Sequence, residues 1–334
     1  MADRLVAAYD AALFDLDGVV YLGPSPVPGA ADGIAALRDL GTKVGFVTNN
    51  AARGPESVAG HLVELGIACD AGDVVTSAQA GARLLADQFP DRGPVLVVGT
   101  SALAAEVTGY GFTVTQSARD HPVAVIQGYD PALDWATLDE AGFALQGGAA
   151  WIATNTDSTR PTDRGLVPGN GAAVEALQTV SPIRPQVAGK PYRPLMDETV
   201  RRLDADRPIF VGDRLDTDVA GAVSTGMDSL LVFTGAHGPA DLLAAQPHER
   251  PTHIGADLRA LLVPARTVEL AANRAVCRDA HAELTDGTLT VTGAGLDALW
   301  ALANLAWWAA DHGKPADAEA ALTGLDDLVD DDVR

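Results

Sequence analysis

The feature that most constrains this chain is the alternation of short apolar runs with amphipathic helical patterns. The apolar runs at residues 11–15, 43–48 and 208–212 are each followed by a stretch of helical periodicity. This alternation is typical of βαβ units, in which helices connect parallel strands. We therefore predict an α/β fold with a doubly wound, mostly parallel sheet, that is, a Rossmann-like core.

A second series of strand-like runs interrupts the first. It lies at residues 95–98, 123–127 and 150–153 and is separated by helical stretches. We predict that residues 80–182 form an α/β cap domain, inserted into a catalytic core of residues 1–79 and 183–262.

The sequence changes character after residue 262. Asp286-Gly287 lies between two β-prone runs and is a strong hairpin signal. Helical patterns follow at residues 296–310 and 315–328. We predict that residues 263–334 form a small C-terminal appendage of one hairpin and two helices.

The charge and cysteine content exclude several classes of function. The chain has 45 acidic and 23 basic residues, a formal charge of −22, so we expect neither nucleic acid nor a membrane as a partner. An anionic substrate would need a metal ion or a few well-placed cations. The two cysteines, Cys69 and Cys277, form no zinc motif and no disulfide framework, and we expect a cytoplasmic location without a signal peptide.

Two of the predicted strands end in carboxylates. Asp15 and Asp17 follow the first run and leave an extended chain on the same side, with Gly18 permitting a tight turn. Asp213 follows the run at residues 208–212. Open α/β sheets bind ligands at the carboxyl ends of their strands, and Mg²⁺ prefers oxygen ligands. We therefore predict metal binding at Asp213, whereas Asp216 is interpreted as a helix cap.

Two other motifs offer hydrogen-bond donors. Thr48, Asn49 and Asn50 end the run at residues 43–48 and could bind phosphate oxygens, although this motif taken alone favours a helix cap. Lys190 precedes a proline at the start of a helical stretch, and the alternative for it is a solvated surface lysine.

Taken together, the four motifs resemble the haloacid dehalogenase superfamily over roughly residues 10–255. They are Asp15-x-Asp17, Thr48, Lys190, and Gly212-Asp213 with Asp218. The carboxylate at Asp17, two residues after Asp15, resembles the motif of the phosphatase branch of this superfamily. The flanking residues resemble those of its NagD-type group, which carries a large α/β cap.

The resemblance implies a phosphoric monoester hydrolase that requires Mg²⁺. It implies that Asp15 is the nucleophile and Asp17 the acid and base. Thr48, Asn49, Asn50 and Lys190 would bind the phosphoryl group. Asp15, the Asp17 backbone carbonyl and Asp213 would hold the metal. Asp218 would orient Lys190 or a metal-bound water, and Arg214 is either a nearby cation or part of a surface ion pair.

The substrate depends on the cap. The polar loop at residues 154–165 resembles the loop that faces the active site in this family. Asn155 and Asp157 could bind substrate hydroxyls and Arg160 an anionic group, or the loop is exposed and makes only local turns. The appendage resembles that of actinobacterial glycerol 3-phosphate phosphatases. We expect a small phosphorylated metabolite, D-glycerol 3-phosphate first and 2-phosphoglycolate or a broader metabolite or nucleotide range second.

Two alternative functions fit the same four motifs. A phosphotransferase would move the phosphoryl group instead of hydrolysing the ester, and a non-catalytic module would bind the phosphometabolite without turnover. In the appendage, Trp300, Trp307 and Trp308 share one helical face, which predicts a buried core or domain contact. If partly exposed, this face could form a homodimer interface.

Overall fold

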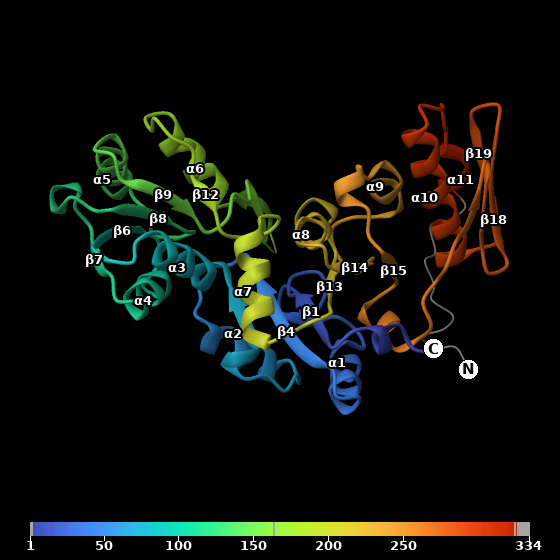
Figure 1. The fold of residues 1–334 in the computed structure, drawn as a ribbon, viewed down its shortest axis with the longest axis horizontal. Coiled ribbons are helices and arrows are strands. Elements are labelled where there is room, and N and C mark those ends of the chain that lie inside the picture. Colours follow the sequence, from blue (N-terminus) through green and yellow to red (C-terminus); the bar gives the residue numbers. More distant parts are fainter. Residues whose placement is uncertain (1–2, 163, 324, 326–334) are drawn as a thin grey trace. The chain divides into compact units, whose positions relative to one another are not determined.

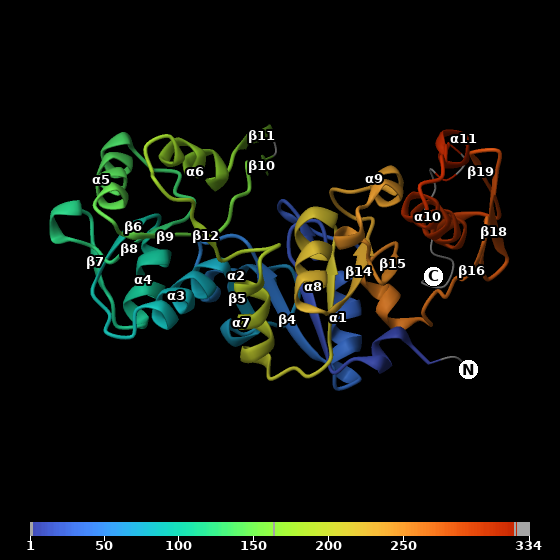
Figure 2. The ribbon, with the colours of Figure 1, turned by 45° about the horizontal axis from the view of Figure 1, so that its top comes forward.

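The computed structural model describes residues 3–162, 164–323 and 325. The chain forms two compact units. The first comprises residues 1–44 and 206–334, and the second comprises residues 45–205. Figure 1 shows their elements, and Figure 2 shows the same ribbon from a second angle.

The first unit contains parallel strands in the order β15–β14–β13–β1. They are β1 (Ala11–Asp15), β13 (Pro208–Gly212), β14 (Asp228–Val232) and β15 (His253–Gly255). All residues of β1 and β13 are buried, as expected for strands with both faces covered. Ala11 pairs with Pro208 and Phe14 with Val211, so the carboxyl ends of β1 and β13 lie next to each other.

Helices and short turns connect these strands. The helices are α1 (Ala30–Asp39), α8 (Ala220–Thr225) and α9 (Pro239–Ala244). The turns are a π-helical turn at Leu215–Val219 and 3₁₀ turns at Leu5–Ala8, Pro247–Glu249 and Leu258–Leu262. The short strands β2 (Tyr21–Leu22) and β3 (Ser25–Pro26) pair as an antiparallel ribbon. The helical stretch expected after residues 208–212 therefore begins as a π-helical turn. The α/β class with a Rossmann-like core is confirmed.

The C-terminal part of the first unit has more strands than we predicted. Its antiparallel sheet consists of β16 (Glu269–Ala271), β17 (Arg274–Cys277), β18 (Ala280–Thr285) and β19 (Thr288–Thr292). The predicted hairpin is β18–β19, and its turn residues Asp286 and Gly287 have positive φ angles of 49° and 81°. β16 and β17 were missed because they are short and lack a clear apolar alternation.

The helices that follow agree in part with the prediction. α10 (Gly295–Asp311) is confirmed, but α11 spans only Glu319–Leu322. The predicted helix at residues 315–328 starts too early because Asp317 is extended: its carbonyl accepts a hydrogen bond from Leu289 N at 2.7 Å. Residues 326–328 lie outside the described residues.

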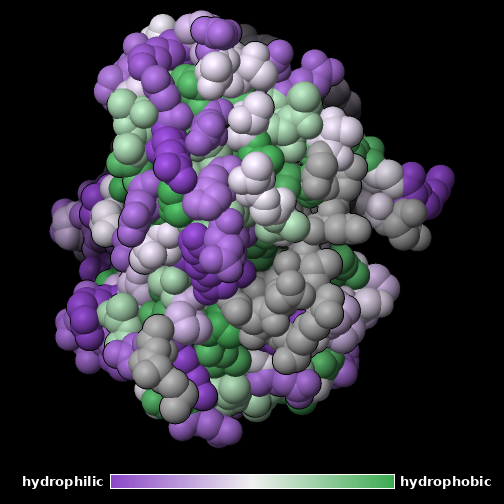
Figure 3. Space-filling model, turned by 90° about the vertical axis from the view of Figure 1, so that its right-hand side faces the viewer, coloured by the Kyte–Doolittle hydropathy of each residue, from purple (hydrophilic) through white to green (hydrophobic). Residues whose placement is uncertain are grey.

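The α10 helix and the sheet of the first unit share one hydrophobic core. Leu231 and Leu242 belong to the same buried cluster as Leu299 and Trp300. Trp307 joins this core and donates a hydrogen bond from Nε1 to Leu242 O at 2.9 Å. The predicted core role of the tryptophan face is confirmed for Trp300 and Trp307. Figure 3 looks onto this end of the chain and shows hydrophilic residues interspersed with apolar ones.

The second unit contains a parallel sheet in the order β12–β9–β8–β6–β7. Its strands are β6 (Pro94–Val98), β7 (Thr113–Thr115), β8 (Ala124–Gln127), β9 (Ala150–Ala153) and β12 (Gln186–Val187). One buried cluster includes residues of α3 (Ser77–Gln88) and α4 (Ser101–Gly109), and another includes residues of α5 (Trp135–Gln146) and α6 (Asn170–Gln178). The sheet is thus covered on both faces, as in other α/β domains.

Besides this sheet, the second unit contains further strands and its helices. They are the parallel pair β4 (Lys43–Thr48) and β5 (Val74–Thr76), the ribbon β10 (Thr159–Thr162) with β11 (Gly165–Pro168), and the helices α2 (Pro55–Glu64), α3 (Ser77–Gln88), α4 (Ser101–Gly109), α5 (Trp135–Gln146), α6 (Asn170–Gln178) and α7 (Arg193–Leu203). β4 begins two residues before the unit boundary. The domain boundaries that we placed before residues 80, 183 and 263 stay predictions. None of the helices among the described residues combines the length and apolar character needed to span a bilayer.

Candidate active site

Three carboxylates of the first unit lie close together. Asp15, Asp213 and Asp218 each offer one oxygen, and these oxygens all lie within 4.8 Å of one another. Asp15 ends β1, Asp213 directly follows β13, and Asp218 lies in the π-helical turn. The arrangement follows from the parallel pairing of β1 with β13, which places the two strand ends side by side. We call this group the carboxylate cluster.

Backbone groups hold Asp213 in place. Ala236 N donates to its Oδ2 at 2.6 Å, and His237 N donates to its carbonyl oxygen at 3.2 Å. A Cβ added to Gly18, whose φ angle is +91°, would lie 2.4 Å from Asp213 Oδ2. Only glycine allows this approach at that backbone conformation. The turn after Asp17 therefore lies directly beside Asp213.

Asp218 belongs to the carboxylate cluster itself. Its Oδ2 accepts a hydrogen bond from Arg214 N at 3.1 Å, which anchors the start of the π-helical turn. Gly212 allows the close contact, since an added Cβ there would lie 2.2 Å from Asp218 Cβ. We had predicted that Asp218 orients Lys190 or a metal-bound water. Its place in the cluster also makes it a candidate metal ligand.

Arg214 and Asp216 form an ion pair beside the cluster. The guanidinium donates to both carboxylate oxygens of Asp216, at 3.1 and 2.7 Å, and both side chains are nearly half exposed. Burial opposes the charge, but the hydrogen bond to Asp216 and the nearby carboxylates raise the pKa of the Arg214 guanidinium. The ion-pair reading of Arg214 matches this geometry. Asp216 pairs with Arg214 and does not cap a helix, which corrects our interpretation.

The carboxylate cluster fits a hard divalent cation. Three carboxylates so close together repel one another unless a cation offsets their charge. Carboxylate oxygens are the ligands that Mg²⁺ takes, and it commonly keeps several waters alongside them. Asp15, Asp213 and Asp218 are thus the residues that could hold Mg²⁺.

A second group of candidate residues lies within the second unit. Thr48 ends β4 and is buried, and its Oγ1 accepts a hydrogen bond from Asn50 N at 3.1 Å. Asn49 Oδ1 accepts from Lys190 N at 2.8 Å, and Asn49 Nδ2 donates to Lys190 O at 3.1 Å. Lys190 is only 3% exposed, so it is not the solvated surface lysine of the alternative reading.

The helix-cap reading of this motif does not hold. The N-cap of α2 is Gly54, and no side chain caps that helix. Asn50 is exposed, and its Oδ1 accepts a hydrogen bond from Ala52 N at 2.8 Å, which stabilises the loop after β4. Thr48 can still donate its hydroxyl hydrogen to an anion.

The cap-loop residues contact other parts of the second unit. Asn155 is buried and donates to Asn49 O at 2.7 Å, and Asp157 accepts from Asn49 Nδ2 at 3.3 Å. Arg160 is exposed, and its Cζ lies 4.8 Å from the centroid of the Tyr129 ring, a cation–π contact. Their role in substrate binding stays a prediction.

Several residues of these two groups were not predicted. Ser77 Oγ donates to Asn49 O at 2.6 Å, and Asn170 Nδ2 donates to Asn155 O at 2.7 Å. In the first unit, residues 234–237 surround Asp213, and the hydroxyl of Thr234 donates to Gly18 O. The Thr-Gly pair that follows the apolar run of β14 was the available signal for this loop.

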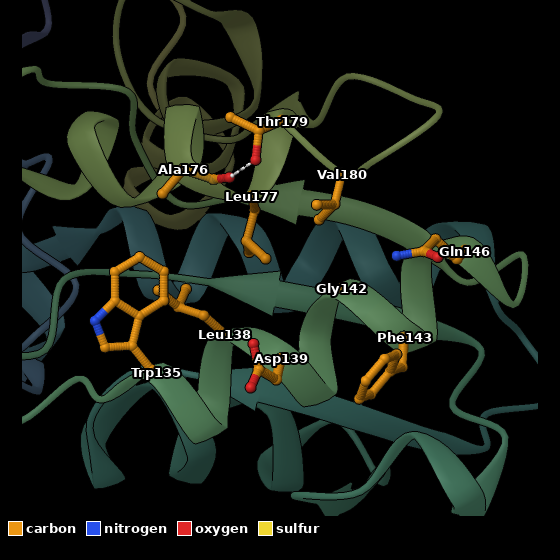
Figure 4. Close-up of a pocket in the computed structure, with 10 residues that line it drawn as sticks. All are labelled: Trp135, Leu138, Asp139, Gly142, Phe143, Gln146, Ala176, Leu177, Thr179 and Val180. Atoms are coloured by element: carbon orange, nitrogen blue, oxygen red, sulfur yellow. Dashed lines mark hydrogen bonds between the residues drawn. The ribbon is translucent and has the colours of Figure 1, made fainter.

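An apolar groove on the second unit does not have the chemistry of this site. It is lined by residues of α5 and the end of α6, including Trp135, Phe143 and Val180 (Figure 4). Asp139 is the titratable residue in its lining, and that lining contains no cation that could bind a phosphate.

Comparisons with known proteins agree with this geometry. A family model described as haloacid dehalogenase-like hydrolase matches residues 12–113, and a HAD-hydrolase-like model matches residues 187–261. Together they include Asp15, Thr48, Lys190, Asp213 and Asp218. They leave out most of the predicted cap and the C-terminal part of the chain.

The chain is also similar to whole proteins. A D-glycerol 3-phosphate phosphatase of Mycobacterium tuberculosis is 47% identical over 253 residues, which is 76% of this chain and 71% of that protein. A 5′-nucleotidase of Bacillus subtilis is 34% identical over 73% of this chain and 94% of its own length. A crystal structure of the M. tuberculosis glycerol phosphate phosphatase in complex with magnesium has a TM-score of 0.87 at 40% identity, covering 97% of this chain and 98% of that one.

The chain therefore belongs to the haloacid dehalogenase-like hydrolases. The closely similar solved structure extends this likeness over nearly the whole chain, including most of residues 263–334.

Proposed function

We propose that this protein is a magnesium-dependent phosphatase that hydrolyses D-glycerol 3-phosphate through an aspartyl-phosphate intermediate. The observation that carries the proposal is the carboxylate cluster, in which Asp15 lies within 4.8 Å of the oxygens of Asp213 and Asp218 in a member of this hydrolase family. A carboxylate nucleophile next to a metal site is the arrangement that such a reaction needs.

The extent of similarity supports glycerol 3-phosphate as the substrate. In sequence, the M. tuberculosis D-glycerol 3-phosphate phosphatase is 47% identical over 76% of this chain, against 34% over 73% for the B. subtilis 5′-nucleotidase. The M. tuberculosis glycerol phosphate phosphatase structure matches 97% of this chain, so its likeness includes the C-terminal sheet and α10. The C-terminal elements carry no proposed catalytic residue, so they support the substrate by analogy with that enzyme.

The nucleotidase similarity supports the second candidate. That relative is 34% identical over 251 residues, and it favours a nucleotide or a broader range of small phosphate esters. The same residues would act on these substrates, because each ester presents the same phosphoryl group to the nucleophile and to the groups that hold it.

The first chemical step forms the phosphoenzyme. An Asp15 carboxylate oxygen attacks phosphorus while the ester P–O bond breaks in line with it. The leaving alkoxide takes a proton from the carboxyl group of Asp17, so glycerol leaves as the neutral alcohol. Asp17 is exposed next to the Gly18 turn, where it can exchange protons with solvent.

The second step regenerates the enzyme. Asp17, now a carboxylate, takes a proton from a water that attacks the phosphorus of the aspartyl phosphate. The bond between Asp15 and phosphorus breaks, and inorganic phosphate leaves.

Cationic and hydroxyl groups hold the phosphoryl group during both steps. We assign this role to the Lys190 ammonium and the Thr48 hydroxyl, as their positions in the family motifs predict. Mg²⁺, bound by Asp15, Asp213 and Asp218, would offset the repulsion between the nucleophile and the phosphate dianion. That residues of both units act on one phosphoryl group stays a prediction from the sequence.

A turnover panel tests the substrate. Release of inorganic phosphate is measured with glycerol 3-phosphate, 2-phosphoglycolate, pyridoxal phosphate and UMP, and transferred product is measured in parallel. We expect the highest kcat/KM with glycerol 3-phosphate and no transfer to added alcohols. A clear preference for another ester would overturn the substrate assignment, and phosphoryl transfer would overturn hydrolysis.

The predictions on binding partners, oligomeric state and cellular location are unchanged. A small phosphorylated metabolite is the partner that the proposed reaction requires. The exclusion of nucleic acid, the possible homodimer and the cytoplasmic location stay predictions from the sequence.

A further inference from the structure

We infer that Asn49 is a positioning residue for Lys190 and does not bind the substrate with its side chain. The inference rests on the proposed function, because it assigns Lys190 to the phosphoryl group. It revises the expectation that Asn49 is itself a phosphate ligand. All the contacts that support this role lie within the second unit.

The hydrogen bonds of the Asn49 side chain are already used within the protein. A side-chain amide has two N–H donors. One partner of Nδ2 is Lys190 O, at 3.1 Å, and the other is the Asp157 carboxylate, at 3.3 Å. Phosphate oxygens accept hydrogen bonds and therefore need donors. With both donors engaged, Asn49 has no side-chain N–H left for a phosphate.

The same amide holds both backbone groups of one residue. Asn49 Oδ1 accepts from Lys190 N at 2.8 Å, while Nδ2 donates to Lys190 O. This paired contact resembles the exchange of hydrogen bonds between two strands. It fixes the point from which the lysine side chain starts, so fewer orientations of the ammonium remain available.

Hydrogen bonds to its backbone carbonyl oxygen hold Asn49 in place. Asn155 Nδ2 donates to Asn49 O at 2.7 Å, and Ser77 Oγ donates to it at 2.6 Å. Asn155 is itself anchored by Asn170, whose Nδ2 donates to Asn155 O at 2.7 Å. The ends of β4 and β9 and the start of α3 thus meet at one residue. We call the contacts of Asn49 with Lys190, Asp157, Asn155 and Ser77 the amide clamp.

The close approach depends on Gly189. A Cβ added there would lie 2.6 Å from Asn49 Oδ1 and 2.5 Å from Thr154 O. Its backbone is not in the left-handed region, so the glycine is needed for space and not for conformation. The absence of a side chain at Gly189 therefore allows Asn49 to contact the backbone of Lys190.

A double-mutant cycle tests the inference. The variants are Asn49→Ala, Lys190→Met and the pair, each measured for kcat and KM with glycerol 3-phosphate and for the Kd of inorganic phosphate by calorimetry. A residue that acts through Lys190 loses its effect when the ammonium is gone. We expect Asn49→Ala to lower kcat/KM by roughly 10- to 100-fold alone, as supporting residues do, but less than about threefold in the Lys190→Met background.

The controls separate positioning from general damage. Gln186→Ala removes a 2.6 Å amide hydrogen bond from Gln88 on the surface of the same unit, and we expect it to leave both readouts unchanged. Asn49→Asp keeps an oxygen for Lys190 N but loses the donors to Lys190 O, so it should recover only part of the activity. If Lys190→Met does not fold, as judged by its melting transition, Lys190→Gln takes its place in the cycle.

The outcomes decide the inference and the proposed function separately. Coupling between the two variants supports positioning, and additive effects overturn it, since an independent ligand or a general loss of structure would act equally in both backgrounds. An inactive wild type that still shows coupling in phosphate binding would overturn the proposed function alone. A wild type that neither turns over glycerol 3-phosphate nor binds phosphate would overturn both.

Discussion

The carboxylate cluster and the amide clamp hold their functional side chains in different ways. In the cluster, backbone N–H groups orient the carboxylates: Ala236 N binds Asp213, and Arg214 N binds Asp218. In the clamp, one side-chain amide orients the backbone of Lys190. A backbone donor is present in every residue type except proline, whereas a side-chain amide is lost with one substitution. We therefore expect substitutions to damage the carboxylate cluster mainly at its acids and glycines, and the amide clamp mainly at its side-chain amides.

The largest expected effect is loss of the nucleophile in the cluster. Asp15→Asn keeps the shape of the side chain but cannot form the acyl phosphate, so we expect turnover to fall by more than about 10³-fold. Phosphate release and the melting temperature are measured together. Near-native turnover in a folded variant would show that Asp15 is not the nucleophile.

Removal of the metal should affect the cluster nearly as much. We expect EDTA to stop turnover and Mg²⁺ to restore it, because the three carboxylates otherwise repel one another and the phosphate. Mg²⁺ should also raise the melting temperature, since a ligand that binds only the folded state stabilises it. Asp213→Asn should weaken both responses to Mg²⁺, and full activity in metal-free protein would contradict the assignment.

A methyl group at Gly189 should damage the clamp without removing any of its polar groups. We expect Gly189→Ala to lower turnover by about 10-fold and to destabilise the fold by about 1–3 kcal/mol, because the added Cβ overpacks against Asn49 and Thr154. Gly60→Ala is the matched control within α2 of the same unit. Apart from its chain neighbours and the backbone of its own helix, no atom of the described residues lies within 4 Å of its added Cβ. The free energy of unfolding of this variant should therefore rise by up to about 1 kcal/mol from helix propensity. Equal behaviour of the two variants would refute the close packing at Gly189.

The smallest effect is expected at Asp216, three residues from Asp213. Asp216→Ala removes an ion pair with Arg214 whose side chains are 45% and 48% exposed. Exposed pairs contribute little, so the free energy of unfolding should change by less than about 1 kcal/mol, with turnover within about twofold. Denaturant titration and steady-state kinetics check this. A loss comparable with that of Asp213→Asn would mean that Asp216 takes part in the site.

The sequence indicated the strand ends well but not the contacts made by the loops. Asp15, Thr48 and Asp213 each follow an apolar run, and each lies at or directly after the end of its strand, as predicted. The sequence predicts that Asp218 orients Lys190 or a metal-bound water, but not that its carboxylate lies among the oxygens of the carboxylate cluster, because the π-helical turn that places it has no clear signature in the residues. The contact of Asn155 Nδ2 with Asn49 O has no signal in the sequence, and the role of Asn155 in substrate binding stays a prediction.

What the sequence by itself determined is the family, the order of strands and helices, and the residues that carry charge at the strand ends. These follow from local apolar periodicity and from polar residues at fixed places beside it. Only the tertiary structure decided that Asn49 pairs with Lys190 across 141 positions of sequence, and that Asp317 extends along β19 when its neighbours suggested a helix. Such contacts depend on how closely separate loops approach each other, a distance that side-chain packing sets and that no local pattern encodes.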